Sequence, residues 1–551
     1  MKKMINVATG REKADLVLKN CKIVDVFSKK IIFGDIAICS EYIAGIGDYS
    51  SNNECDLHGQ YVMPGFIDSH VHIESSMVTP IEYAKAVMPK GVTTVIADPH
   101  EIANVCGVSG IDFMIKCAKI VPLSVEFMIP SCVPATPFEN SGDVIDSEII
   151  KNLMKTNFLG LGEMMNYNGV INADDEVLAK LKCANIIDGH APFVTGNDLN
   201  AYVCAGIKTD HECTTLSEMS EKISKGMYIQ IREGTLSKNL EELVGGINSA
   251  TLKRCTFCSD DRYLGDIIKY GTINYCVEKA IKLGVEPLDA IVIATINAAE
   301  CYGLKKIGAV APGYFADLVI TDDLSLSKIN RVYKKGVLVA QDNNVLFDAN
   351  ITEINENVLC TVHLPKITSE SFKINTDKQE IPVIRVNKDT ITTTRVMRKL
   401  SDKLSKVAVI ERHKMTGNIG LGFVENYDIM GGAIASTIGH DSHNVIVIGD
   451  NDEDMAFAVN SLGRSGGIAV CSNGEILEML ELKIAGLLSD KEINEVLIGH
   501  ERLHNAAKNL MINPEINPFM TLAFLPLPVI PEIRITDMGL FDVTKFEFIK
   551  I

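Results

Sequence analysis

Short apolar runs recur through the first half of the chain and alternate with segments that are mostly long enough to hold a helix. The runs are residues 66–72, 92–99, 125–132, 159–166, 185–192, 207–212, 228–234 and 256–261. Strands that alternate with helices form parallel β-α units, and eight such units predict a closed (β/α)8 barrel of the TIM type. We therefore predict an α/β protein in which residues 65–304 form this barrel.

A second pattern flanks the predicted barrel on both sides. Residues 1–64 contain short strands of alternating apolar and polar residues, separated by Gly and Asp turns. The same pattern of short strands recurs in residues 305–350. We interpret these two segments as halves of one flanking β-sandwich domain that the barrel splits in sequence. After about residue 350 the pattern changes again, with candidate strands at 382–386, 407–412 and 444–449. Residues 370–551 are predicted to form a separate C-terminal α/β domain.

Composition and charge narrow the class of protein. A chain of 551 residues with 46% hydrophobic and 23% charged residues is an ordinary globular protein of several domains. Its net charge of −18 disfavours a nucleic-acid partner. The N-terminus lacks the apolar region of a signal peptide, and no apolar run reaches membrane-spanning length. The 15 cysteines lack a short regular spacing, which indicates reduced thiols.

These properties lead to expectations about location and partners. We expect a cytoplasmic protein that acts on a small, neutral or cationic molecule and that binds neither nucleic acid nor a membrane. From the frequency of symmetric assemblies alone, we expect a homo-oligomer, either a dimer or a tetramer.

The first apolar run ends in two histidines, His70 and His72. Side chains at positions i and i+2 of a strand point to the same face, so the two imidazoles lie side by side at the end of this strand. Such a pair is half of a metal site.

Other strand ends supply matching chemistry. The fourth run supplies Glu163, the fifth His190, the sixth His211, and the eighth Asp260 with Asp261. The carboxyl ends of barrel strands meet at one mouth, where the active sites of such barrels lie. Imidazole nitrogens and carboxylate oxygens are the ligands of divalent transition metals. Any one of these residues alone would be read as a hydrogen-bonded surface residue, but together they predict a metal site.

Two further groups of residues have open interpretations. His100 and Glu101 follow the second run, so they either face the pocket or cap the next helix. Three further residues lie outside the barrel, in the segment of the C-terminal domain that begins at Gly439. They are His440, Asp441 and His443. We expect this domain to fold over the barrel mouth as a lid that excludes water, and the alternative is a solvated turn.

The ligand pattern resembles the amidohydrolase superfamily, which has His-x-His on strand one, His on strands five and six, and Asp on strand eight. Many binuclear members have a carbamylated lysine on strand four, where this chain has Glu163. That glutamate and several other segments are similar to the bacterial adenine deaminases. These segments are residues 64–76, 97–105, 188–192, 259–262 and 439–444. The resemblance covers the barrel and continues into the C-terminal part.

The resemblance implies hydrolytic deamination of adenine to hypoxanthine and ammonia, with water as co-substrate, in purine salvage or catabolism. It also implies two divalent metal ions, manganese or iron, with zinc as the alternative. The expected metal ligands are His70, His72, Glu163, His190, His211 and Asp260. Glu163 is expected to bridge the two ions.

Proton transfer in this reaction needs groups within hydrogen-bond reach of the substrate. Asp260 is expected to accept a proton from the attacking water and to pass it toward the leaving amine. A ring nitrogen must also be protonated, and Glu101, Asp261 and His100 all remain candidates. The expected substrate-binding residues are His100, Glu101, His440, Asp441 and His443.

Two alternatives remain. A related metal-dependent enzyme that opens a cyclic amide, such as a dihydroorotase or an imidazolonepropionase, would use a similar site. Glu163 in place of lysine counts against a dihydroorotase. A catalytically silent barrel that serves as a scaffold would be expected to lose ligands, whereas this chain keeps every expected ligand type.

Overall fold

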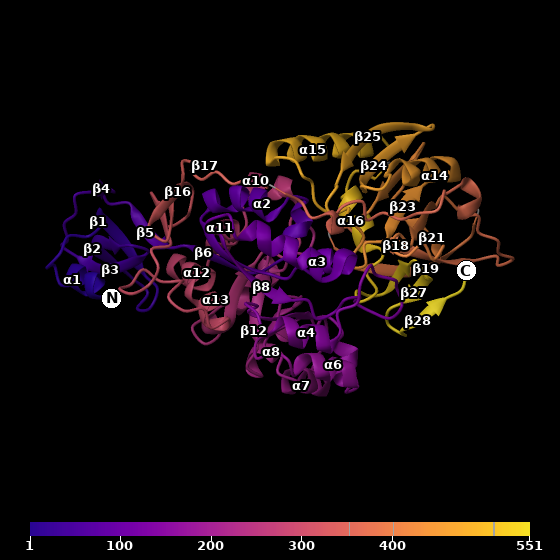
Figure 1. The fold of residues 1–551 in the computed structure, drawn as a ribbon. Helices are drawn as coiled ribbons and strands as arrows, with labels where there is room; N and C mark the ends of the chain where they lie inside the picture. Colours follow the sequence, from indigo (N-terminus) through magenta and orange to yellow (C-terminus); the bar gives the residue numbers. More distant parts are fainter. Residues whose placement is uncertain (352, 389, 401, 511–512) are drawn as a thin grey trace.

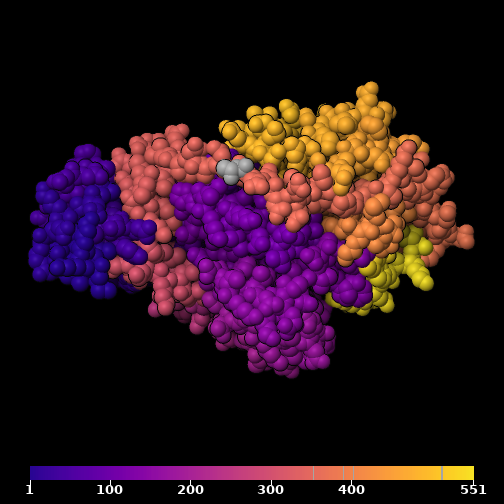
Figure 2. Space-filling model, viewed as in Figure 1, coloured from indigo at the N-terminus to yellow at the C-terminus, as the bar shows by residue number. Residues whose placement is uncertain are grey.

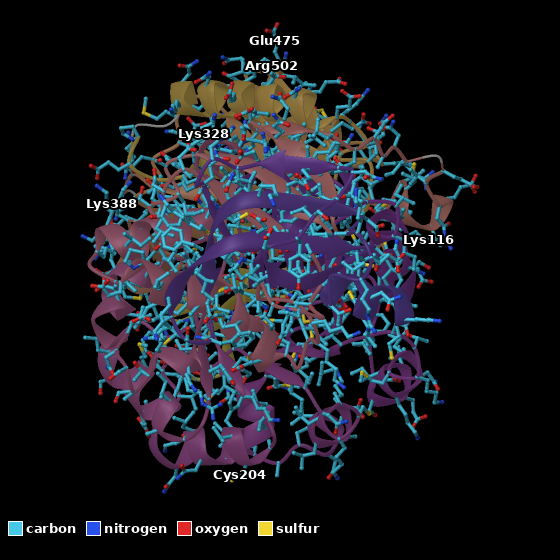
Figure 3. The ribbon with its side chains drawn as sticks, turned by 90° about the vertical axis from the view of Figure 1, so that its left-hand side faces the viewer. Lys116, Cys204, Lys328, Lys388, Glu475 and Arg502 are labelled. Atoms are coloured by element: carbon cyan, nitrogen blue, oxygen red, sulfur yellow. The ribbon has the colours of Figure 1, made fainter. Side chains whose placement is uncertain are left out.

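The computed structural model describes residues 1–351, 353–388, 390–400, 402–510 and 513–551. Three parts lie in a row, with the N-terminal β domain at one end, the barrel in the middle and the C-terminal domain at the other end (Figure 1). Charged side chains such as Lys116 and Glu475 project from the rim of the molecule in this view (Figure 3). None of the described helices combines the length and the apolar content that crossing a bilayer requires.

The central part is a barrel of parallel strands. Its strands are β6 (Phe66–Val71), β7 (Val92–Ala97), β8 (Ser124–Ile129), β9 (Gly160–Met164), β10 (Ile187–Gly189), β11 (Thr209–Asp210), β12 (Tyr228–Arg232) and β13 (Cys255–Cys258). They pair in the orders β10-β9-β8-β7-β6 and β11-β12-β13. A bridge between Val71 and Asp260 joins the two sheets on one side, and the Lys208 amide donates to the Ile187 carbonyl on the other. All eight apolar runs therefore overlap a barrel strand, and the predicted fold class is confirmed.

Helices follow most of these strands and cover the outside of the barrel. They include α2 (Pro80–Val87), α3 (His100–Ala118), α4 (Ser147–Leu153), α6 (Asp175–Leu181), α7 (Gly196–Cys204), α8 (Leu216–Ser224), α10 (Leu264–Tyr270), α11 (Ile273–Lys282), α12 (Pro287–Ala294) and α13 (Ile296–Cys301). Because α3 begins at His100, directly after β7, its first turn lies at the carboxyl end of the strands.

The N-terminal segment and the segment after the barrel build one β domain. Its strands are β1 (Leu16–Asp25), β2 (Lys30–Cys39), β3 (Tyr42–Gly47), β4 (Glu54–Asp56), β5 (Tyr61–Pro64), β14 (Leu318–Thr321), β15 (Ile329–Lys334), β16 (Val337–Gln341) and β17 (Asn344–Val345). The segments join directly, because β5 pairs antiparallel with β14. A bridge from Tyr42 to Phe315 brings the far edge of the sheet back toward this junction. The domain is thus one sheet that curls over its core, a refinement of the predicted two-layered sandwich.

The C-terminal domain is built on a sheet of eight strands. These are β18 (Ile381–Val386), β19 (Thr393–Arg398), β20 (Ser405–Ile410), β21 (Ile419–Glu425), β22 (Ala433–Ser436), β23 (Val445–Gly449), β24 (Gly467–Ser472) and β25 (Glu475–Glu481). The helices α14 (Asp452–Ser461), α15 (Ile493–Leu510) and α16 (Pro518–Phe524) accompany it, followed by the strands β26 (Ile533–Thr536), β27 (Gly539–Asp542) and β28 (Glu547–Ile549). The three strands expected from the sequence correspond to β18, β20 and β23.

The C-terminal domain lies directly against the barrel (Figure 2). The Ser489 amide donates to the Met77 carbonyl at 2.9 Å, and the Ile493 amide donates to the Glu82 carboxylate at 2.9 Å. Hydrogen bonds of this kind require a defined position of one domain relative to the other. The structure therefore places the C-terminal domain over residues that follow β6.

A barrel loop strengthens this contact. Phe138, in the long segment between β8 and α4, packs against Phe541, Phe546 and Phe548, with ring centroids 4.7, 5.6 and 5.7 Å away. Two residues later, the Asn140 side chain donates to the Asp537 carboxylate at 2.6 Å. The loop thus carries an aromatic anchor and a polar anchor into the C-terminal domain.

Candidate metal centre

The two histidines of the first strand lie close together at the barrel mouth. His70 is the fifth residue of β6 and His72 follows its end, and both side chains are buried. Their Nε2 atoms are 3.1 Å apart. Nδ1 of His72 lies 3.0 Å from the carbonyl oxygen of Asp98, which can only accept, so Nδ1 carries the proton. Nε2 of His72 faces the centre, and loss of its proton would free the lone pair that a metal-binding imidazole requires.

Glu163, in β9, spans two pairs of histidines. One carboxylate oxygen, Oε1, lies 3.1 Å from Nε2 of His72, and the other, Oε2, lies 2.8 Å from Nδ1 of His190. Oε2 is also 3.2 Å from Nε2 of His211. The backbone amide of Glu163 donates to the Asp98 carboxylate at 3.0 Å, which fixes this point of the strand. A carboxylate in this position has one oxygen for each half of the site.

Asp260 follows β13 and faces the first-strand histidines. Its Oδ1 lies 3.3 Å from Nε2 of His72 and 3.6 Å from Nε2 of His70. Its backbone has a φ of 53°, in the left-handed region that a residue with a side chain enters at a cost of about 1 kcal/mol or more. The surrounding structure holds Asp260 in this conformation, which aims its carboxylate into the barrel.

Two charged residues that the sequence reading did not single out hold the other oxygen of Asp260. Nη1 of Arg232 donates to Asp260 Oδ2 at 2.7 Å, and the same guanidinium forms a two-pronged pair with Glu212 at 2.5 and 2.9 Å. Both residues stand at the ends of predicted strands, so the rule that found the histidines would also have found them. Arginine is not a metal ligand, so a pattern of metal-ligand residue types does not include it.

The charges of the site favour an ionised bridge. Burial raises the pKa of the Glu163 carboxyl, but the neighbouring imidazoles of His211 and His190 outweigh burial and hold this pKa well below its usual range. Burial and then the charge of His211 lower the pKa of His70 well below its usual value, so His70 is a neutral imidazole. For His211 burial lowers the pKa, but the charge of Glu163 more than compensates and raises it to about 9.

The donor set fits divalent metal ions. Nitrogen and oxygen atoms of His70, His72 and Glu163 lie within 4.8 Å of one another, and so do those of Glu163, His190 and His211. All of these side chains are buried, and unpaired buried carboxylates are costly unless a cation neutralises them. Imidazole and carboxylate are ligands that zinc, iron and manganese accept. The six predicted ligands thus meet at one point of the barrel mouth, with Glu163 common to both groups.

The C-terminal domain brings three further residues to this mouth. His440 Nδ1 lies 3.3 Å from Oε1 of Glu101, and His443 Nε2 lies 4.0 Å from Oε2 of the same residue. Asp441 Oδ1 lies 3.6 Å from Nε2 of His100. All five side chains are buried, so neither a solvated turn around residue 440 nor an exposed cap on α3 describes them. The predicted substrate-side residues are therefore neighbours, contributed by two domains.

A serine links two of the candidate acids. Ser75 Oγ donates to Asp261 Oδ1 at 2.5 Å and lies 3.2 Å from Oε1 of Glu101. Burial, together with the charges of Asp261 and Glu74, raises the pKa of Glu101 well above its usual value. Glu101 therefore retains a proton to higher pH than an ordinary carboxyl group, at a position close to Ser75 and Asp261.

Five of the six predicted metal ligands, all except His70, line one side of a cavity, and an apolar wall forms the other. The wall consists of Met165 from the barrel and Ile391, Phe524, Leu527 and Ile530 from the C-terminal domain. The ring of Phe524 is stacked on His440, with centroids 4.3 Å apart and an interplanar angle of 8°. Asp261, His100 and Asp441 also line this cavity, whereas the Glu101 side chain lies behind it. The sequence reading did not predict the apolar wall, because its residues lie in segments with no motif.

Comparison with known proteins gives matches to both large domains. The amidohydrolase family matches residues 61–358, and the adenine deaminase C-terminal domain matches residues 375–547. The chain is 52% identical to the adenine deaminase of Clostridium acetobutylicum over 99% of both chains. It is 44% identical to that of Nitratidesulfovibrio vulgaris Hildenborough, over 99% of this chain and 98% of the relative. It is also 44% identical to adenine deaminase 2 of Desulfotalea psychrophila, over 100% of this chain and 99% of the relative.

Proposed function

This chain belongs to the amidohydrolase family and, within it, to the adenine deaminases, and on this basis we propose that it hydrolyses adenine to hypoxanthine and ammonia. The observation that carries the proposal is the position of Glu163 between two pairs of histidines, in a cavity that the adenine-deaminase-type domain closes. The relatives supply the substrate, and the site supplies groups that suit its chemistry.

We propose that the site binds two divalent ions, manganese or iron, with zinc as the alternative. Their ligands would be His70, His72, Glu163, His190, His211 and Asp260, and Glu163 would be shared by both ions. When bound, such ions act as Lewis acids and lower the pKa of water toward neutrality.

Asp260 is the proposed general base. Its Oδ1 faces the centre, and its Oδ2 accepts the 2.7 Å hydrogen bond from Arg232. Burial raises the pKa of Asp260, but the positive charge of Arg232 and the hydrogen bond from His72 outweigh it and hold the carboxyl well below its usual range. The carboxylate is therefore ionised and can accept a proton from the attacking water and deliver it to the departing amine.

Protonation of the purine ring needs an acid on the cavity surface. Asp261 lines the cavity, and Ser75 connects it to Glu101, whose raised pKa favours the protonated acid. We propose that Glu101 supplies the proton, that Ser75 relays it, and that Asp261 presents it to the ring. The relay leaves Glu101 ionised and Ser75 and Asp261 unchanged. The attacking water loses two protons in the net reaction, one to the departing amine and one that restores Glu101. Of the three candidates that the sequence left open, Glu101 is thus proposed as the source of the proton and Asp261 as the residue that contacts the ring.

The cavity suits a flat heterocycle. Polar groups of the barrel mouth face the apolar wall across it, and the stacked rings of Phe524 and His440 offer a planar surface. An aromatic base can lie between an apolar wall and a few polar groups that fix its orientation. We propose that His100, His440, Asp441 and His443 belong to this substrate side, with Glu101 behind them.

The test is ammonia release from adenine by purified protein supplied with manganese, compared with a panel of cyclic amides. Activity on adenine supports the proposal. Hydrolysis of a cyclic amide with no release of ammonia from adenine would favour the dihydroorotase-like or imidazolonepropionase-like alternative. Binding of metal with no activity on any compound would favour a silent scaffold.

The cellular context of this reaction is also a proposal. A role in purine salvage or catabolism, cytoplasmic location and assembly into a dimer or tetramer fit a base-converting enzyme of this family. Light scattering on the metal-loaded protein measures the number of subunits directly.

A further inference from the structure

A second cavity adjoins the one at the metal-binding side chains. Five residues line both cavities: Glu212, Arg232, Ser237, Ile391 and Ile530. The outer cavity also touches Phe193, whose side chain is 57% exposed, and Lys238, which is exposed. The outer cavity thus extends from the surface of the molecule to the site, and the shared residues mark the junction.

The junction between the two cavities is held by side-chain hydrogen bonds on one side and is formed by connecting segments on the other. On the barrel side, Arg232 and Glu212 are held to each other by two hydrogen bonds, and Arg232 is also held to Asp260. On the other side, Ile391 and Ile530 come from two connecting segments of the C-terminal domain, outside its strands. The width of the junction therefore depends on how the backbone of these two isoleucines is held.

Arg534, in β26, holds both of them. Its side chain is completely buried, and its guanidinium donates to the carbonyl oxygens of Ile530 at 2.7 Å and Ile391 at 2.6 Å. A third hydrogen bond of 2.8 Å reaches the carbonyl of Phe524, the residue that stacks on His440. In the described part of the chain, Arg534 forms no ion pair with a carboxylate, so backbone carbonyls alone satisfy this buried cation.

This arrangement is specific to the guanidinium group. Burial of a cation is costly unless its donors are satisfied, and arginine has five N–H donors in a fixed plane. One guanidinium can therefore join three separate segments, whereas a lysine ammonium lacks this planar, forked geometry. The three segments joined here all carry residues of the apolar wall.

We propose that the junction is the passage by which the purine base reaches the metal-binding side chains, and that Arg534 is the positioning residue that sets its width. The proposal rests on the proposed function, because a purine base is the molecule that must pass. It identifies Ile391 and Ile530 as residues that determine the size of the accepted base.

The test compares kcat/KM for adenine with kcat/KM for adenines that carry a methyl group at position 2, 8 or 9. Ile391→Ala and Ile530→Ala widen the passage directly, and Arg534→Met releases the carbonyls that hold both residues. The measured ratio is kcat/KM for the methylated adenine divided by kcat/KM for adenine. We expect each variant to raise this ratio about tenfold for at least one methylated adenine, the usual effect of one carbon in an apolar pocket. Arg534→Lys should restore part of the wild-type ratio.

A matched control separates positioning from folding. Arg502→Met removes an arginine whose side chain is 62% exposed, at the outer edge of the C-terminal domain (Figure 3), and should leave the ratio unchanged. A merely structural role of Arg534 would lower the melting temperature and leave the ratio unchanged, and this result would overturn the proposal for Arg534. If Arg534→Met does not fold, the two isoleucine variants still decide.

The failure of this proposal and that of the proposed function give different results. Wild-type protein with no activity on adenine contradicts the function itself. If the wild-type protein is active and the ratio is unchanged in both Ile391→Ala and Ile530→Ala, the proposed passage is contradicted. Ile391→Trp provides a test in the opposite direction, because a larger side chain at the junction should lower kcat/KM for adenine at least tenfold while the metal content stays at the wild-type level.

Discussion

His440 Nδ1 lies 3.3 Å from Oε1 of Glu101, although the two residues belong to different domains. Glu101 is in the first turn of the helix that follows the second barrel strand, and His440 lies just after a strand of the C-terminal sheet. Both side chains are buried. The barrel alone therefore lacks part of the pocket surface, and the C-terminal domain completes it.

Replacement of His440 tests this shared surface. His440→Ala removes the ring that stacks on Phe524 and contacts Glu101, so we expect kcat/KM for adenine to fall about 10²-fold, a typical effect for a positioned polar group. The metal content should be unchanged, because no predicted metal ligand is altered. His58→Ala serves as the control, since that side chain is 83% exposed. Wild-type kinetics in His440→Ala would contradict a role for the C-terminal domain in the site.

Two conservative variants separate metal binding from proton transfer. Glu163→Gln keeps the size of the bridge but removes its charge, so metal content and activity should fall together. Asp260→Asn should reduce kcat about 10²-fold or more while retaining most of the metal, because it removes the proposed base. Metal analysis alongside kinetics measures both quantities. Wild-type activity in either variant would contradict the assigned role.

Metal affinity should depend on pH. The pKa of His211 is raised to about 9 in the metal-free site, so this ring carries a proton at pH 7 that an incoming ion must displace. Protons compete less as pH rises, and affinity should increase about tenfold per pH unit for each displaced proton until pH exceeds the pKa. Calorimetric titration with manganese at pH 6, 7 and 8 measures this slope. An affinity that is independent of pH would show that no protonated ligand binds the ion.

A buried ion triad should stabilise the barrel. Lys222 is completely buried and donates to Asp210, Glu218 and the Ala191 carbonyl at 2.9, 2.8 and 2.7 Å. Lys222→Met leaves two buried carboxylates without their cation, so we expect the free energy of unfolding to fall by about 3–5 kcal/mol. Denaturant unfolding measures the change, and Lys225→Met is the control because Lys225 is only partly buried. A loss below about 1 kcal/mol would show that the carboxylates find other partners.

The aromatic anchor between the domains can be tested separately. Phe138→Ala removes the ring that packs against Phe541, Phe546 and Phe548, and should destabilise the protein by about 2–3 kcal/mol. It should also lower kcat/KM, because the domain that carries His440 is then held less firmly. Phe33→Ala, at a ring that is 74% exposed, should change neither quantity. An unchanged kcat/KM in Phe138→Ala would mean that other contacts suffice to position the C-terminal domain.

The strand-end residues were predictable because they depend on local patterns. An apolar run that ends in His-x-His places both imidazoles on one face of a strand, and a barrel brings all strand ends to one mouth. His70, His72, Glu163, His190, His211 and Asp260 lie together for this reason. Arg232 and Glu212 also lie at strand ends of this mouth, where they position Asp260.

The remaining residues of the site follow no local rule. Phe524, Ile391 and Ile530 lie in segments without periodicity, and their position depends on the hydrogen bonds that Arg534 makes to backbone carbonyls far apart in the chain. Ser75 links Glu101 to Asp261 only because three strand ends converge. No pattern in the sequence specifies such pairings.

The periodicity of apolar residues and the chemistry at strand ends are properties of short segments, so the sequence sufficed to predict the barrel, the split β domain and the residues that gather at the barrel mouth. Only the tertiary structure decided which oxygen of Glu163 faces which histidine, how Arg232 orients Asp260, and which domain supplies the pocket wall. The physical reason is that these features arise from contacts between residues up to several hundred positions apart, and such contacts exist only when the packed domains bring them within hydrogen-bonding distance.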